Sequence, residues 1–146
     1  MKSVLKQRLL PGNIAVLWNY LTNSELLAAW LTHSDDLAIG TKFALNFDNI
    51  TVQASVTKLI NQSLIEFNLS DNEGKELGLL VFRLRLNDGR LELTIIDGSL
   101  PQQSFIDKLF YKFKANQREA YWQTRLNSLE YSLEQATGQK AYNSLS

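Results

Sequence analysis

The chain contains no cysteine and a single histidine. The lack of cysteine excludes disulfide bonds and metal sites built on thiolates, and it suits a reducing cytoplasm. Fifteen basic and fifteen acidic side chains cancel, so the net charge is zero. The chain therefore lacks the strong positive charge of a non-specific nucleic-acid binder, and we expect no nucleic-acid partner.

Long hydrophobic runs are also missing. No stretch of about 18 apolar residues occurs, so we expect no transmembrane segment. The first residues are not a signal peptide, because Lys6, Gln7 and Arg8 interrupt any apolar core. The phosphate-binding, dinucleotide-binding, metalloprotease, calcium-loop and Gly-x-Ser-x-Gly motifs are absent as well. These absences favour a cytoplasmic protein outside those enzyme classes.

What is present is enough for one domain. The chain has 146 residues, of which 45% are hydrophobic and 10% aromatic. A chain of this length buries roughly 68–70% of its unfolded surface, which is sufficient for a substantial core. We therefore predict a single domain over residues 1–146, with a flexible tail at residues 139–146.

Alternating apolar and polar residues predict the strands. The alternation runs through residues 41–47, 50–57, 64–70, 77–86 and 90–96. Tight-turn residues separate these stretches, and Asp88-Gly89 is the clearest hairpin signal. One dry and one wet face is typical of an antiparallel sheet. Residues 2–9 alternate loosely and would add a first strand at one edge.

Helical signals flank the strands. Asn13 is a plausible N-cap for a first short helix. Thr22 and Glu25 have the spacing of a capping box that would start a second helix. Near the C-terminus a narrow apolar seam predicts helix within residues 104–137, as one piece or two, and Gly138 is a stop signal. The seam is formed by Trp122, Leu126, Leu129, Leu133 and Ala136.

The resulting fold class is α+β: a curved antiparallel sheet of about six strands around a long C-terminal helix, with two short helices after the first strand. A sheet wrapped round a helix can leave an apolar cavity for a hydrophobic small molecule or lipid. The alternative is that the same side chains fill a solid core. The residues predicted to line the cavity are Trp30, Phe43, Phe47, Phe67, Phe82, Leu84, Trp122 and Leu126.

The alternation places no acid, base or nucleophile on the inner face, so we predict no catalytic residue and no cofactor. Glu66, Arg83, Arg85 and Glu92 fall on the outer face. There the two arginines either bind an anion or, as we prefer, pair across strands with the glutamates.

His33, next to Asp35 and Asp36, could form a metal site or lie in a solvated loop, and we favour the loop and predict no metal. The aromatic and basic residues 105–114 would either pack on the sheet or contact a membrane or partner.

The N-terminal motif resembles a known family. Residues 17–22 read Leu-Trp-Asn-Tyr-Leu-Thr, residues 25–27 read Glu-Leu-Leu, and Trp30 follows. With Trp122 and the spaced leucines after it, this resembles the family named after the activator of the ninety-kilodalton heat-shock chaperone's ATPase. That family lies within the helix-grip superfamily of START-like lipid-transfer proteins and the birch-pollen allergen.

The resemblance implies the helix-grip fold over nearly the whole chain. It also implies two alternatives to ligand binding. One is a protein-interaction module that activates a chaperone ATPase. The other is an enzyme of the polyketide-cyclase kind, which would need His33, Tyr20 or Tyr121 to point into an open cavity.

Overall fold

The structure is a computed structural model. It describes residues 4–47, 50–98 and 105–138, and for residues 105–116 it describes the backbone alone. The predicted flexibility of residues 139–146 concerns residues outside these ranges. The side chains of the aromatic and basic residues 105–114 are also outside the described part. None of the described helices is long and apolar enough to cross a membrane.

The described residues form one six-stranded sheet in the order β1-β6-β5-β4-β3-β2, in which every neighbouring pair is antiparallel. Strands β2 to β6 follow the chain as a meander, and β1 closes the far edge by pairing with β6. This confirms the predicted topology. The strands are β1 (Val4–Leu10), β2 (Lys42–Phe47), β3 (Ile50–Ile60), β4 (Leu64–Ser70), β5 (Glu76–Asn87) and β6 (Arg90–Asp97).

The turns and one irregularity explain the strand boundaries. Asp88 and Gly89 have φ values of +53° and +75°, so both central residues of the hairpin are left-handed, as a type I′ turn requires. Strand β3 runs three residues past the predicted end at Thr57, because a bulge between Val56 and Lys58 shifts its register. The bulge breaks the simple alternation, which is why the pattern alone ended the strand early.

The two short helices are α1 (Ile14–Thr22) and α2 (Ser24–Trp30). Asn13 caps α1, as predicted, by accepting a hydrogen bond from the amide of Val16 at 2.9 Å. The predicted cap at Thr22 is wrong, because Asn23 accepts from the amides of Glu25 and Leu26 instead. Thr22 still belongs to the last turn of α1, and its hydroxyl donates to the Trp18 carbonyl, so it is not free to cap α2.

The C-terminal helix α3 (Phe105–Thr137) is one continuous helix of 33 residues. It ends at Gly138, whose φ is +71° and whose amide donates to the Glu134 carbonyl at 2.9 Å. This confirms the stop signal and answers the question left open by the sequence. The polar residues 116–119 include neither glycine nor proline, so nothing there forces a kink.

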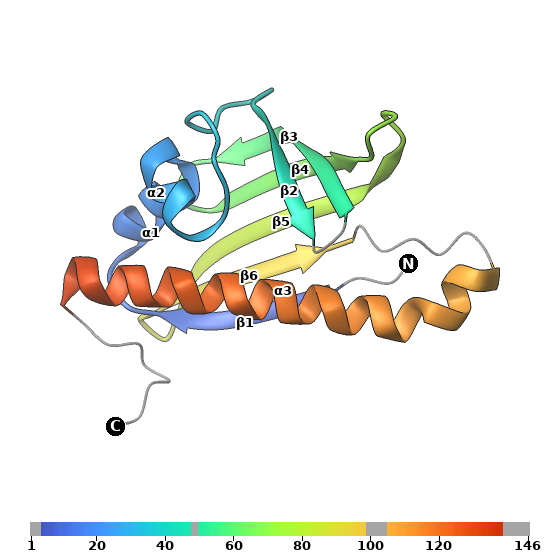
Figure 1. Cartoon of the computed structure of the whole chain (residues 1–146). Helices are drawn as coiled ribbons and strands as arrows, with labels where there is room; N and C mark the ends of the chain where they lie inside the picture. The colour runs from blue at the N-terminus through green and yellow to red at the C-terminus, as the bar shows by residue number, and fades with distance from the viewer. Residues whose placement is uncertain (1–3, 48–49, 99–104, 139–146) are drawn as a thin grey trace.

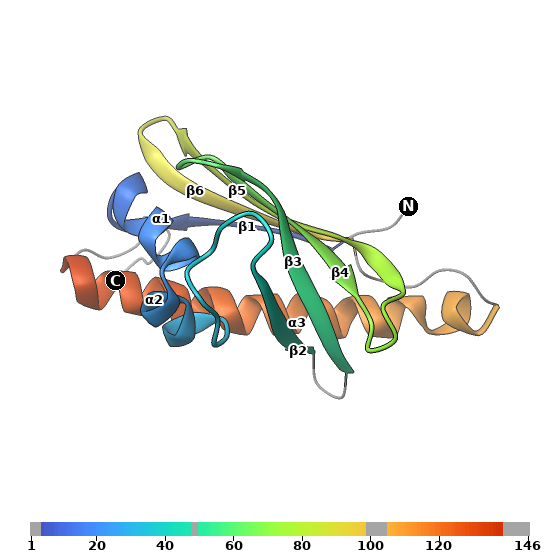
Figure 2. The same cartoon turned by 90° about the horizontal axis from the view of Figure 1, so that it is seen from above.

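Helix α3 lies along one face of the sheet, and the sheet twists over it (Figures 1 and 2). Helices α1 and α2 lie near its C-terminal end, where α2 packs against it. The core fills the space between them. Four residues of the predicted seam, Trp122, Leu126, Leu129 and Leu133, are fully buried, so the α+β helix-grip architecture is confirmed.

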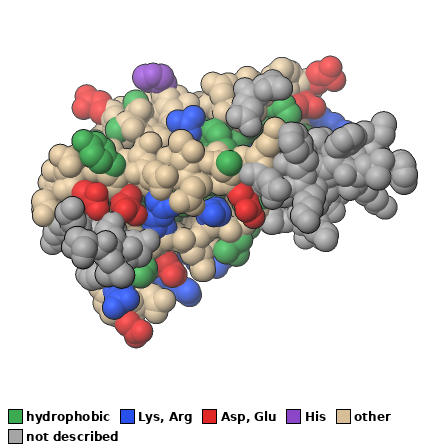
Figure 3. All heavy atoms as spheres, turned by 60° about the horizontal axis from the view of Figure 1, so that its bottom comes forward, with side chains coloured by type: hydrophobic (Ala, Val, Ile, Leu, Met, Phe, Trp, Pro, Cys, Tyr) green, Lys and Arg blue, Asp and Glu red, His purple; other side chains and the backbone are tan. Residues whose placement is uncertain are grey.

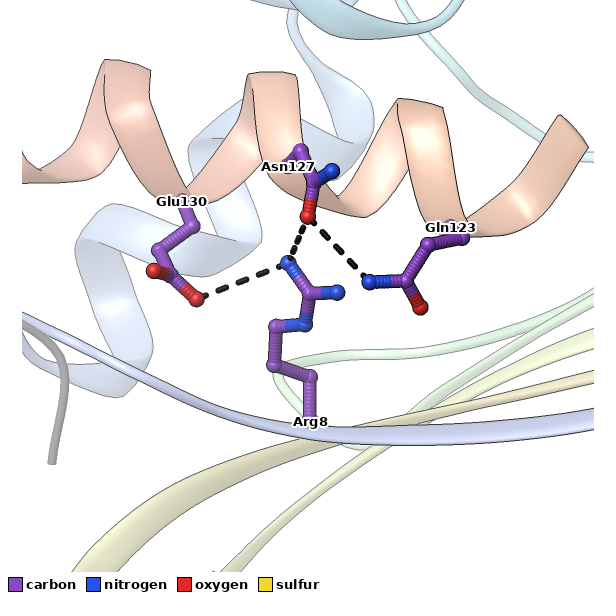
Figure 4. Close-up of polar contacts among 4 residues, drawn as sticks. All are labelled: Arg8, Gln123, Asn127 and Glu130. Carbon is purple, nitrogen blue, oxygen red and sulfur yellow. Dashed lines mark hydrogen bonds and ion pairs between the residues drawn. The ribbon is translucent and has the colours of Figure 1, made fainter. Parts of the chain in front are cut away.

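A polar contact ties α3 to the edge strand β1. The side chain of Arg8 points at the helix, and its Nη1 donates to Asn127 Oδ1 at 2.7 Å and lies 3.5 Å from Glu130 Oε1 (Figure 4). Gln123 Nε2 donates to the same Asn127 oxygen. Only 9% of the Arg8 side chain is exposed. The guanidinium is therefore held by partners in place of water, as a desolvated charge requires.

The face seen in Figure 3 carries acidic and basic side chains interspersed among uncharged ones. No extended field of one sign is visible on its described part. This distribution agrees with the zero net charge of the chain, and it offers none of the clustered positive charge that nucleic-acid binding uses.

Candidate functional site

The eight residues predicted to line a cavity are all buried, and none is more than 5% exposed. Six of them are aromatic and touch one another in a continuous aromatic cluster. Neighbouring ring centroids lie 5.1–5.9 Å apart, at angles from tilted to edge-on, which are favourable geometries. The structure thus brings the predicted residues together, and their role as ligand contacts stays a prediction. The contacts are Trp30–Phe82, Phe82–Phe67, Phe67–Phe43, Phe82–Trp122 and Trp122–Phe47.

The residues considered for an enzyme lie in different places. His33 is exposed in the loop after α2, and no group of three potential metal ligands occurs among the described residues. Tyr20 is buried, and its carbonyl accepts from Trp30 Nε1 at 2.8 Å. Tyr121 is half-buried and lines a pocket, described below.

A buried polar cluster lies on the inner face beside the aromatic residues. Asp97, the last residue of β6, is completely buried, and its Oδ2 accepts hydrogen bonds from Arg118 Nη1 at 3.2 Å and Trp122 Nε1 at 2.9 Å. Arg118 is only 8% exposed. The prediction that the alternation places no acid, base or nucleophile on the inner face is therefore wrong for Asp97, and Arg118 is a second charged group there that the prediction did not include.

The sequence did contain a signal for both. Asp97 has the same parity as Leu91, Leu93 and Ile95, so the alternation of β6 continues inward through it. The predicted strand over residues 90–96 stops one residue before Asp97. Arg118 lies one helical turn before Trp122 and therefore shares its face of α3.

Arg118 also stacks on the end of the aromatic cluster. Its Cζ lies 3.8 Å from the centroid of the Phe47 ring, a cation–π distance. The Phe47 ring in turn lies 4.5 Å from that of Tyr121. Phe47 and Arg118 thus lie at the edge of the aromatic cluster, at the end of β2.

A pocket of about 490 Å³ opens beside these residues, where the end of β2 meets α3. Its walls combine a guanidinium, a phenol, two amides, a hydroxyl and a methyl group. Arg125 Cζ lies 4.8 Å from the centroid of the Tyr121 ring, so the two longest lining side chains are in contact. The lining residues are Asn46, Gln117, Ala120, Tyr121, Thr124 and Arg125.

Burial raises the pKa of the Tyr121 phenol above its ordinary value of 10.0, although the nearby guanidiniums of Arg125 and Arg118 pull the pKa back. Desolvation disfavours the charged phenolate, and it outweighs the two positive charges. The phenol is therefore protonated at neutral pH. It can donate a hydrogen bond to a molecule in the pocket.

The raised pKa of Tyr121 predicts that the stability of the protein depends on pH in the alkaline range. Above pH 10.0 the unfolded chain loses the Tyr121 proton while the folded protein retains it, so the Tyr121 contribution to stability is lost as the pH rises through the folded pKa. We expect Tyr121→Phe to remove this part of the alkaline destabilisation. Urea unfolding of both proteins across the alkaline range measures it. Parallel stability curves for the two proteins would contradict the shift.

The outer face follows the predicted alternation only in part, because Glu92 and Thr94 of β6 are buried, with 8% and 4% exposed. Arg85 Nε donates to Glu92 Oε1 at 2.8 Å, from β5 to β6, which confirms the cross-strand pairing of charges. The Arg85 side chain is 57% exposed. The Glu92 side chain is only 11% exposed, so the pair is half-buried, and it serves below as a comparison for the fully buried pair of Asp97 and Arg118.

Comparison with known proteins identifies the relatives of this arrangement. The sequence model of the family described as activator of Hsp90 ATPase homolog 1-like protein matches residues 12–134. The Aha1 dimer from Colwellia psychrerythraea is similar in structure, with a TM-score of 0.68 and 18% identity over 94% of this chain and 100% of that one. Protein MLL2253 from Mesorhizobium loti has a TM-score of 0.66 and 20% identity over 93% and 98%.

DynU16, a protein from the dynemicin biosynthetic locus, has a TM-score of 0.70 and 18% identity over 98% of this chain and 51% of its own. The present chain thus spans about half the length of DynU16. At these identities the structural likeness concerns the fold alone. No curated protein matches the chain. Because the family match covers most of the sequence, the chain belongs to the family of activator of Hsp90 ATPase homolog 1-like proteins.

Proposed function

We propose that the protein binds a small amphipathic molecule in the pocket where β2 meets α3, without catalysing a reaction on it. The observation that carries the proposal is the pocket itself. Its volume is about 490 Å³, and because Asn46, Gln117, Ala120 and Thr124 of its lining are exposed, it is an open pocket at the surface that would bury only part of a ligand. The pocket adjoins the aromatic cluster through Tyr121, whose ring contacts both Phe47 and Trp122.

The pocket lining has an apolar part and a polar part, and this combination suits an amphipathic ligand. The Tyr121 ring and the Ala120 methyl group offer an apolar surface, while Asn46, Thr124 and Arg125 offer polar groups. We infer that the apolar part of the ligand rests on the tyrosine and extends toward Phe47. Deeper entry would need the buried rings to move, since they already touch one another.

The chemistry of the lining supports binding over catalysis. Its described residues include no carboxylate, imidazole or thiol that could remove a proton. The carboxylate of Asp97 is fully buried and accepts hydrogen bonds from Arg118 and Trp122. The phenol of Tyr121 has a raised pKa, so it is a donor and a poor base.

A fluorescence titration with N-phenylnaphthylamine, an uncharged apolar probe, tests the proposal. We expect saturable binding by the intact protein. Ala120→Trp places an indole in the pocket and should reduce the affinity at least tenfold. Ala136→Trp, at an exposed position of the same helix outside the pocket lining, is the matched control and should bind like the original. Absence of saturable binding, or equal binding by both variants, would contradict the proposal.

A second candidate function comes from family membership, since the family is described by its likeness to an activator of the Hsp90 ATPase. If the protein acts in this way, adding it should raise the ATP turnover of the Hsp90 chaperone from the same cell. Ala120→Trp should leave that stimulation unchanged. No stimulation at a large molar excess would exclude this candidate and leave ligand binding untouched.

A further inference from the structure

We propose that the ligand of this pocket carries an oxyanion, and that Arg125 and Tyr121 bind that oxyanion together. The inference rests on the proposed function and specifies the class of ligand. The expected ligand has an apolar body that carries a carboxylate, sulfonate or phosphate group.

The first argument is the charge of the lining. Among the described lining residues Arg125 is the charged one, and no described carboxylate faces it across the pocket. Within the described part of the chain, the contact found for Arg125 is with the ring of Tyr121. A half-buried guanidinium of this kind attracts an anion more strongly than a fully hydrated one would.

The second argument is the different state of the other arginine. Arg118 lies two helical turns from Arg125 on the same face, but it is bound to Asp97 in the core. Its charge is therefore compensated by a buried carboxylate. The positive charge available to a ligand in the pocket comes from Arg125.

The third argument is the position of the donors. Tyr121 and Arg125 are four residues apart, so their side chains lie together on one helical face. Arg125 lies over the Tyr121 ring, with its Cζ 4.8 Å from the ring centroid, and burial keeps the phenol protonated at neutral pH. The phenol O–H and the guanidinium N–H groups are therefore adjacent donors in the pocket lining, and two adjacent donors fit the two oxygens of an oxyanion.

Two probes with the same ring system separate the anion from the apolar body. N-phenylnaphthylamine is neutral, and anilinonaphthalene sulfonate adds a sulfonate. We expect the protein to bind the sulfonate more tightly. Arg125→Gln should weaken sulfonate binding by about tenfold to a hundredfold, the range for a charge-assisted hydrogen bond, while changing binding of the neutral probe less than twofold. Arg125→Lys should restore part of the loss.

The matched control is Arg83→Gln, which removes the same unit of charge from an exposed position on the outer face of the sheet. It should leave both affinities unchanged, because screening removes the effect of a distant charge. Thermal unfolding of each variant confirms that it is folded. Dodecanoate should displace the sulfonate probe, whereas inorganic phosphate at the same concentration should not.

The outcomes separate the two proposals. Equal binding of the sulfonate by the original protein and Arg125→Gln would overturn the oxyanion assignment and leave the pocket as a site for neutral molecules. An equal loss of affinity for both probes in Arg125→Gln would also overturn the oxyanion assignment, because the arginine would then only shape the pocket. Displacement by phosphate alone would overturn the apolar body of the ligand. Failure of both probes to bind the original protein would remove the proposed function itself.

Discussion

Replacing Asp97 by alanine is expected to lower the free energy of unfolding by about 3–5 kcal/mol, because it breaks a buried ion pair by removing one partner. The carboxylate is fully buried and accepts hydrogen bonds from both Arg118 and Trp122. Without it, the guanidinium charge and the indole N–H both lose an acceptor in a dry environment. Urea unfolding followed by far-ultraviolet circular dichroism measures the change.

The outer ion pair supplies the control for this experiment. Arg85→Gln removes the bond to Glu92, whose side chain is 11% exposed, while the Arg85 side chain is 57% exposed, so we expect a smaller change of about 1 kcal/mol. The double variant Asp97→Leu with Arg118→Met replaces both buried charges by apolar groups. It should be more stable than Asp97→Ala alone, because no unpaired charge remains. A loss below about 1 kcal/mol for Asp97→Ala would show that water reaches the site.

Replacing Trp122 by alanine should cost about 3–5 kcal/mol, as for other fully buried large residues. The indole is completely buried and contacts the rings of Phe47, Phe82 and Tyr121. Its removal leaves a cavity at the centre of the aromatic cluster and also deprives Asp97 of a donor. Circular dichroism is the suitable probe, because the substitution removes one of the three tryptophans that report on folding by fluorescence.

Two further variants separate the causes. Trp122→Phe keeps an aromatic ring but loses the N–H donor, so its cost should fall between those of the original protein and Trp122→Ala. Tyr131→Ala changes an aromatic residue of the same helix that is 63% exposed, and it should alter stability by no more than about 0.5 kcal/mol. A near-neutral Trp122→Ala would mean that the ring is not part of the core.

The fold was predictable because nearly every strand has one dry and one wet face. In β4 the predicted and observed bounds agree at Leu64–Ser70, where buried and half-buried residues alternate without a break. The errors occur where a local interaction replaces the periodic pattern. One is the bulge after Val56, and another is the cap, where Thr22 and its neighbour Asn23 both have the chemistry of an N-cap.

The candidate site was less predictable, because its polar members are recognisable only as a pair. Asp97 and Arg118 are 21 residues apart in sequence. Each is a charged residue, and a charged residue considered alone is expected at the surface. An aspartate before Gly98 also matches the pattern of a turn. The pocket itself depends on where the end of β2 meets α3, and a periodic pattern carries no information about that meeting point.

The pairing of β1 with β6 has a consequence for how the protein is made. Arg8 and Asn127, which hold the edge strand to the helix, are 119 residues apart. On the ribosome, the hairpins between β2 and β6 can form as they emerge, since each joins neighbouring segments. The first strand has to wait, unpaired, until its partner strand and then the helix have been synthesised. Non-local closure of this kind leaves the first strand without its partner for most of translation, and an unpaired strand edge favours aggregation.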